Sequence, residues 1–198
     1  WIPIGFNLNN GDDSYVPFKG HFAGEDGAVI KNLGFKASNT LNVSADLATT
    51  VRSQKYAGFF GVVEGATINN IQIQTMDVNA EMSGILAGCA VDSTIRDVEV
   101  SNAKICGTTY VGGLVGVAKS SSASADERDM IIEDTNCAKV SVYTNTAVTG
   151  ATDGIDGHGA VGGVVGYAVN ASVIDSTVTT NTGSGNHIYG KHAFVGGI

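Results

Sequence analysis

Two aspartates and a histidine form the densest group of chemically capable side chains in the sequence. Asp153, Asp156 and His158 lie within residues 152–159, which read TDGIDGHG. Paired carboxylates can act as acid and base toward a glycosidic bond, and carboxylate oxygens also bind calcium. This segment therefore supports one catalytic hypothesis, the cleavage of a polysaccharide.

Two further histidines and two tyrosines complete the candidate binding residues: His187, His192, Tyr143 and Tyr189. The histidines lack the two- or four-residue spacing that metal ligands favour, so solvated or turn histidines are the preferred interpretation over a metal site. Tyrosines beside Asn and Asp are typical of carbohydrate-binding surfaces, where the ring is a platform and polar groups bind the sugar edge. We expect no catalytic residues, no metal centre and no cofactor, with calcium left open.

Two other motif matches support no site. Residues 157–162 spell G-x-G-x-x-G, but a dinucleotide site needs that motif between a strand and a helix, and here a β repeat follows. Residues 7–13 resemble the start of a calcium loop, with Asn7, Asn9, Asp12 and Asp13. No glutamate follows at the position of the bidentate ligand, so we interpret this stretch as a polar turn.

The elements that must position these residues are repeats, because a glycine phrase recurs along the chain. It reads VGGLVG at 111–116 and returns at 161–166, begins again at 195–198, and is degenerate at 56–61 and 83–88. In the copy at 83–88, Ile85 stands where the second glycine belongs. The interval from Gly61 to Gly88, about 27 residues, gives the shortest repeat.

A second phrase follows each glycine phrase and has a strand pattern. It begins with Ile at 68, 95, 132 and 174, with an earlier copy at 30, and two positions later holds Asn32, Asn70, Asp97, Asp134 or Ser176. Apolar residues then alternate, as in a strand with one buried face, and Asn, Asp or Ser suits a turn. Stacked copies would form apolar ladders and a column of turn hydrogen bonds.

These features together predict an all-β fold, a right-handed parallel β-helix (β-solenoid) with short strands and Gly-rich turns. Residues 1–29 match the repeats least and are predicted to be an N-terminal cap or lead-in, and 30–198 the repeats. The end within a glycine phrase suggests a fragment of a longer array. Extra residues at 36–55, 138–160 and 180–194 should share one corner and one side, and 119–128 should form a separate flexible loop.

Composition restricts the function classes. The 27 Gly, 2 Pro and 15% charged residues favour short strands and tight turns over helices. A net charge of -8 with scattered Lys and Arg argues against nucleic-acid binding. The uncharged stretch 157–174 belongs to the repeat, so we expect no membrane span. Three separated cysteines, Cys89, Cys106 and Cys137, indicate buried apolar positions and no metal finger.

The glycine phrase with its downstream Ile-x-Asn/Asp strand resembles the GLUG repeat of bacterial surface proteins, adhesin-like proteins and M26-type immunoglobulin A peptidases. The lead-in residues WIPIG at 1–5, FKGHF at 18–22 and GAVIKNL at 27–33 also resemble the segment that precedes such repeats. The resemblance implies an exported, cell-surface β-helical module without catalytic residues in the repeats. No H-E-x-x-H zinc-protease motif occurs here.

Our hypothesis is a non-catalytic, extracellular or cell-surface bacterial module, adhesin-like or stalk-forming, with a glycan or a host or matrix protein as partner. The alternative is a carbohydrate-active β-helix, a polysaccharide lyase or hydrolase, that uses the 153–158 loop. Residues 157–159 resemble the glycine-flanked histidine of polygalacturonase-like hydrolases, but their Asn-Thr-Asp and Arg-x-Lys companions are absent. Three or more carboxylates within coordinating reach on one face would favour the enzyme, whereas scattered, solvated acids would favour the module.

Overall fold

The computed structural model describes residues 1–5, 15–25, 27–36, 55–122, 129–144, 159–179, 188–190 and 193–197. Within these ranges the chain forms strands and turns and contains no helix, and every strand pair is parallel. None of the described residues therefore belongs to a helix that could cross a membrane. The predicted all-β architecture with parallel strands is confirmed.

The described strands form three sheets. The first holds β1 (His21–Ala23), β2 (Val29–Lys31), β6 (Thr67–Gln74), β9 (Thr94–Ser101), β12 (Met130–Glu133), β13 (Asn136–Ala138), β17 (Ala171–Ile174) and β18 (Thr177–Thr179). The second holds β3 (Gly34–Lys36), β4 (Tyr56–Ala57), β7 (Asp77–Ser83), β10 (Lys104–Gly112), β14 (Ser141–Thr144), β15 (Gly159–Gly162), β19 (Ile188–Tyr189) and β20 (Ala193–Gly196). The third holds β5 (Phe60–Glu64), β8 (Ala87–Val91), β11 (Val115–Lys119) and β16 (Val165–Val169).

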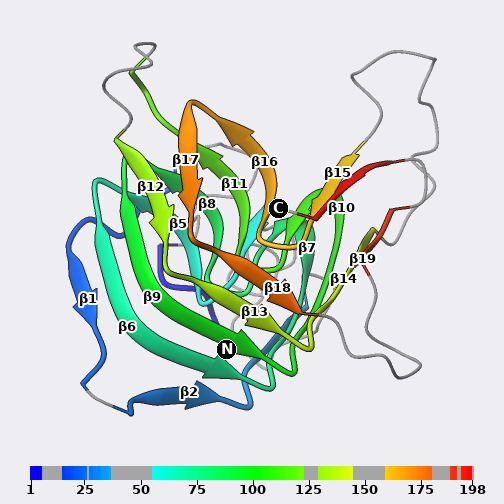
Figure 1. Ribbon diagram of the computed structural model, residues 1–198, viewed down its shortest axis with the longest axis horizontal. Helices are drawn as coiled ribbons and strands as arrows, with labels where there is room; N and C mark the ends of the chain where they lie inside the picture. The colour runs from blue at the N-terminus through cyan, green and yellow to red at the C-terminus, as the bar shows by residue number, and fades with distance from the viewer. Residues whose placement is uncertain are drawn as a thin grey trace, which may run out of the picture.

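Along the sequence, the chain passes through the first, second and third sheets in the same order each time. One passage through all three sheets is called a coil below. From β6 it passes to β7, β8 and then β9, which pairs with β6 in parallel. Figure 1 shows β6, β9, β12 and β17 side by side, with the strands of the other two sheets behind and beside them. The Ser93 hydroxyl accepts a hydrogen bond from the amide of Ala66, 27 residues earlier, so one coil sits directly on the next.

The core consists of stacked ladders of like residues. Ile68, Ile95 and Ile132 occupy one register position of the first sheet and are fully buried. A second ladder, Ile73, Val100 and Cys137, runs beside it. Period-two alternation points these side chains inward, and stacking removes their apolar surface from water at about 25 cal/mol per Å². Both predicted ladders are confirmed in these three coils.

The predicted register is wrong in two copies of the second phrase. Ile30 pairs with Ile73, so residues 30–35 continue into the second sheet, where Phe35 pairs with Val78. The copy at 174 is displaced by one residue. Val173, and not Ile174, pairs with Ile132, and Ile174 is 44% exposed. Asp175 therefore takes the turn position that the sequence analysis gave to Ser176.

The first residues of the chain cover the core at β5 and β6. Ile4 and Phe18 bridge to Phe60 and Val63 of β5, and β1 pairs with β6. The indole of Trp1 stacks on the ring of Phe59, with centroids 5.1 Å apart. The rings of Trp1 and Phe18 thus pack against Phe59 and Phe60 at this end of the core.

The extra segments that were predicted to share one corner lie largely outside the described residues, so their common side stays a prediction, and only the strands that flank them are described. β3 and β4 both pair with β7, and β14 and β15 both pair with β10. The strands on either side of residues 37–54 and on either side of residues 145–158 therefore all belong to the second sheet, and their partners β7 and β10 pair with each other. The segment 180–187 follows β18, between the first and second sheets, and 120–129 connects the third sheet to the first.

The three cysteines are free thiols and are buried, as predicted. Cys89 stands between Val62 and Val117, and Cys137 follows Val100 in its ladder. Burial raises the pKa of Cys89 to about 11 and that of Cys137 to about 12, while nearby Lys119 lowers the pKa of Cys89. Both therefore act as small apolar core residues.

Candidate functional site

Residues with a left-handed backbone conformation occur at the same register position in neighbouring coils of the first sheet, and they bend the chain there. Asn70, Asp97, Asp134 and Asp175 have φ values of 53°, 51°, 50° and 45°. Asn and Asp tolerate this conformation because their short polar side chains bond locally. The bend breaks the alternation: in β6, Ile68 and Ile71 are both buried, with two outward residues between them. The same interruption recurs in each of the four coils.

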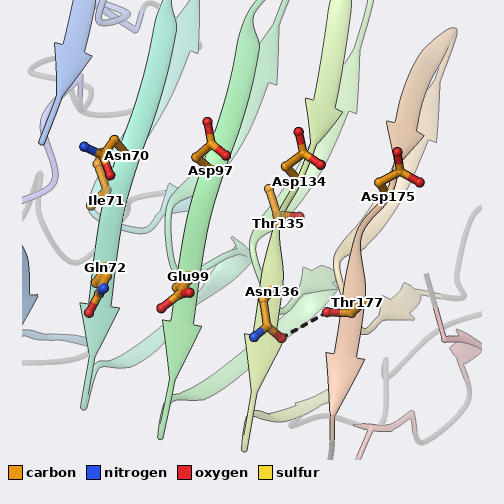
Figure 2. A pocket seen from close by; sticks show the side chains of 10 residues that line it. All are labelled: Asn70, Ile71, Gln72, Asp97, Glu99, Asp134, Thr135, Asn136, Asp175 and Thr177. Atoms are coloured by element: carbon orange, nitrogen blue, oxygen red, sulfur yellow. Dashed lines mark hydrogen bonds between the residues drawn. The ribbon is translucent and has the colours of Figure 1, made fainter. Parts of the chain in front are cut away.

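The bend creates a groove on the outer face of the sheet, called the polar groove here. It has a volume of about 370 Å³. Figure 2 shows its polar side chains in two rows that cross neighbouring coils of the first sheet. The lining residues are Asn70, Ile71, Gln72, Asp97, Glu99, Asp134, Thr135, Asn136, Asp175 and Thr177. Since neighbouring strands lie about 4.8 Å apart, equivalent groups repeat at that interval along the groove.

Hydrogen bonds between coils fix several of these side chains. The Thr177 hydroxyl donates to Oδ1 of Asn136 at 3.1 Å, as the dashed line in Figure 2 marks. The Asn70 amide donates to the carbonyl of Gly24 at 2.9 Å, and buried Thr135 donates to the Ser176 hydroxyl at 2.9 Å. The groove wall is therefore held by contacts that depend on stacking.

The charge of the groove is negative. Its lining residues include the carboxylates of Asp97, Glu99, Asp134 and Asp175 and no Lys or Arg. The nearest cation in sequence, Arg96 on β9, forms a salt bridge with Glu133 on β12. The free acceptors can bind the hydroxyl or amide hydrogens of an extended ligand. Across the described ranges, no three His, Cys, Asp or Glu side chains are arranged to hold a metal ion.

The structure places only part of the predicted site. Tyr143 of β14 pairs in register with Tyr189 of β19, so their backbones are adjacent, and Tyr189 is 55% exposed. The other predicted binding residues lie outside the described residues: Asp153, Asp156, His158, His187 and His192. The predicted gathering of all seven on one surface thus stays a prediction.

The polar groove was missed by the sequence analysis, although its first row was visible there. The column of Asn and Asp after each Ile was interpreted as turn hydrogen bonding alone. The second row, Gln72, Glu99, Asn136 and Thr177, varies in type and so gave no repeat signal. The strand register places the residues of both rows side by side along one groove.

Comparison with known proteins identifies the repeat. The family model described as the GLUG motif matches residues 157–182, which cover β15, β16, β17 and β18. The match includes the glycine phrase at 161–166 and the strand phrase after it. No curated protein and no solved structure shows a significant match to the chain. The resemblance to GLUG-motif proteins is confirmed.

Proposed function

We propose that this GLUG-motif protein is a right-handed parallel β-helix that acts as a non-catalytic, adhesin-like binding module. The β-helix is supported by the repeated passage through three parallel sheets and by the general right-handedness of parallel crossovers. An extracellular or bacterial cell-surface location is supported by the GLUG resemblance.

The polar groove carries the proposal. Four coils present hydrogen-bonding side chains at the same two positions, on a surface built by sheet strands. A rigid, periodic row of acceptors suits an extended ligand with repeating hydroxyl or amide groups. A glycan chain or an extended stretch of a host or matrix protein has that chemistry.

A binding screen with groove variants tests this proposal. We would screen the purified chain, with and without calcium, against neutral glycans and matrix proteins. The test variant is Asp97→Asn/Glu99→Gln/Asp134→Asn, which removes three charges at nearly constant shape. The matched control is Glu81→Gln, an exposed acid of β7 in the second sheet.

We expect a ligand whose affinity falls at least about tenfold in the groove variant and is unchanged in the control, since lost hydrogen bonds to charged groups cost roughly 1.5–3 kcal/mol each. Equal binding by both variants would remove the groove from the proposal. Release of oligosaccharides from a polysaccharide substrate by the wild-type chain would favour the enzymatic alternative.

A further inference from the structure

A second cleft lies on a different face, over the outer surface of β5, β8 and β11. Its volume is about 420 Å³, and its lining residues are Tyr15, Pro17, Tyr56, Val62, Glu64, Cys89, Val91 and Lys119. Neither the predicted site nor the polar groove includes any of these residues. We call it the tyrosine cleft.

The floor of the tyrosine cleft is apolar and closely packed. Val62 and Cys89 of this floor point outward from the third sheet, as does Val117 next to Cys89, yet each is less than 8% exposed. They form a small cluster with Met82, against which Tyr15, Tyr56, Val91 and Tyr110 pack. The floor is therefore a preformed surface supported by the sheet.

Aromatic side chains bound the cleft. Tyr15 and Tyr56 meet edge to face, with ring centroids 4.9 Å apart. Farther along the same face, Tyr110 stacks on Tyr167 at 4.6 Å, and Tyr167 is 44% exposed. Tyrosine rings offer a flat apolar face beside a hydroxyl, which matches a sugar ring with its apolar C–H face and polar edge.

The charges around the cleft differ in sign from those of the polar groove. Lys119 lines it, and the Lys55 ammonium lies 5.8 Å from the centroid of the Tyr56 ring. Glu64, its one lining carboxylate, is already paired with Lys19 at 3.3 Å. The chain as a whole carries a net charge of -8, so this local excess of lysines is opposite in sign to the charge of the whole chain.

The other nearby acid is also engaged. Asp92 accepts hydrogen bonds from the amide and hydroxyl of Ser121 at 2.7 and 2.5 Å. No salt bridge joins Lys119 to a carboxylate among the described residues. Lys119 is exposed, and its backbone lies two strands from that of Glu64 in register, roughly 10 Å away at about 4.8 Å per strand.

We propose that the tyrosine cleft binds an acidic saccharide, with the sugar ring over the tyrosine and valine floor and a uronate carboxylate on Lys119. An acidic sugar fits this face because its carboxylate meets here an ammonium that forms no salt bridge with any described residue, whereas it would meet four carboxylates in the polar groove. The apolar floor and the aromatic edges supply the contact area that a charge alone lacks. This site is independent of the polar groove and of the function proposed for it.

The test is calorimetric titration of the full chain with a hyaluronan hexasaccharide, which alternates uronic acid and N-acetylhexosamine. The same hexasaccharide with its carboxyl groups reduced is the matched neutral ligand. Lys119→Gln is the test variant, and Lys31→Gln, an exposed lysine of β2, is the matched control. Both lysines are exposed, so both variants should retain the wild-type melting temperature.

We expect the acidic hexasaccharide to bind wild type and Lys31→Gln alike and to bind Lys119→Gln at least about tenfold more weakly, and the reduced ligand to bind all three equally weakly. Tyr56→Leu, which keeps an apolar side chain but removes the ring, should weaken both ligands. The proposal is overturned if the acidic ligand does not bind wild type, if the two lysine variants weaken equally, or if carboxyl reduction leaves the affinity unchanged.

Discussion

The carbonyl oxygen of Gly163 lies where a Cβ atom on Gly113 would stand. Both residues belong to the turn between the second and third sheets, one coil apart, and a Cβ on Gly163 would in turn meet the carbonyl of Gly197. The second glycine of the phrase is thus required by close backbone approach between coils. In the copy of the phrase at 83–88, Ile85 stands at the position equivalent to Gly113 and is fully buried. Glycine is therefore required at this position only in some copies.

Replacing Gly113 with alanine should therefore destabilise the chain by about 3 kcal/mol, the upper end of the usual cost of overpacking, because the clash is with backbone that cannot rotate away. Gly34→Ala is the matched control, since its nearest non-neighbouring atom to a new Cβ is 3.9 Å away. Thermal unfolding should show a melting temperature lower by roughly 6 °C or more for Gly113→Ala and nearly unchanged for Gly34→Ala. Equal stability of the two variants would contradict the stacking.

The corrected register of the last coil predicts that truncating Ile132 and truncating Ile174 have different effects on stability. Ile132→Ala should cost about 2–5 kcal/mol, because a fully buried side chain leaves a cavity. Ile174→Ala should change stability by no more than about 0.5 kcal/mol, because Ile174 points to solvent. Urea unfolding of both variants measures this difference. A large loss in Ile174→Ala would restore the register inferred from the sequence.

The sequence predicted the ladders because the interval from the glycine phrase to the next isoleucine is the same from Gly61 to Ile68 as from Gly88 to Ile95. It failed at residue 174 because Val173 and Ile174 are both apolar and β-branched, so composition cannot choose between them. A usable signal was present, since the spacing from Ile132 to Cys137 equals that from Val173 to Val178. The polar groove and the tyrosine cleft could not be predicted because each joins residues from different coils.

The left-handed backbone conformation predicts how substitutions of Asp97 change stability. Asp97→Gly should leave stability nearly unchanged, because glycine adopts this conformation freely and that gain offsets its entropic cost. Asp97→Val should be less stable than Asp97→Gly by about 1–2 kcal/mol, since a β-branched residue is strained there. Chemical denaturation measures the difference in the free energy of unfolding between the two variants, and unchanged m values would show that only stability has changed. A valine variant as stable as the glycine variant would argue against the bend.

The buried thiols predict how stability depends on alkaline pH. The pKa of Cys89 is raised to about 11 and that of Cys137 to about 12, chiefly by burial, from 9.0 for a free thiol. Above pH 9 the unfolded chain loses these protons while the folded chain keeps them. The free energy of unfolding should therefore fall as pH rises from 9 toward 11, by at most about 1.4 kcal/mol per pH unit for each thiol.

The double variant Cys89→Val/Cys137→Val separates this effect from other alkaline titrations. Val62 and Val117 flank Cys89, and Val100 and Val178 flank Cys137, so valine already occurs at the same positions of adjacent coils. The variant should fold and show a shallower loss of stability between pH 9 and 11, measured by urea unfolding. In wild type, both thiols should resist Ellman's reagent at pH 8 until the chain unfolds. Rapid labelling of native Cys137 would show that its ladder is open to solvent.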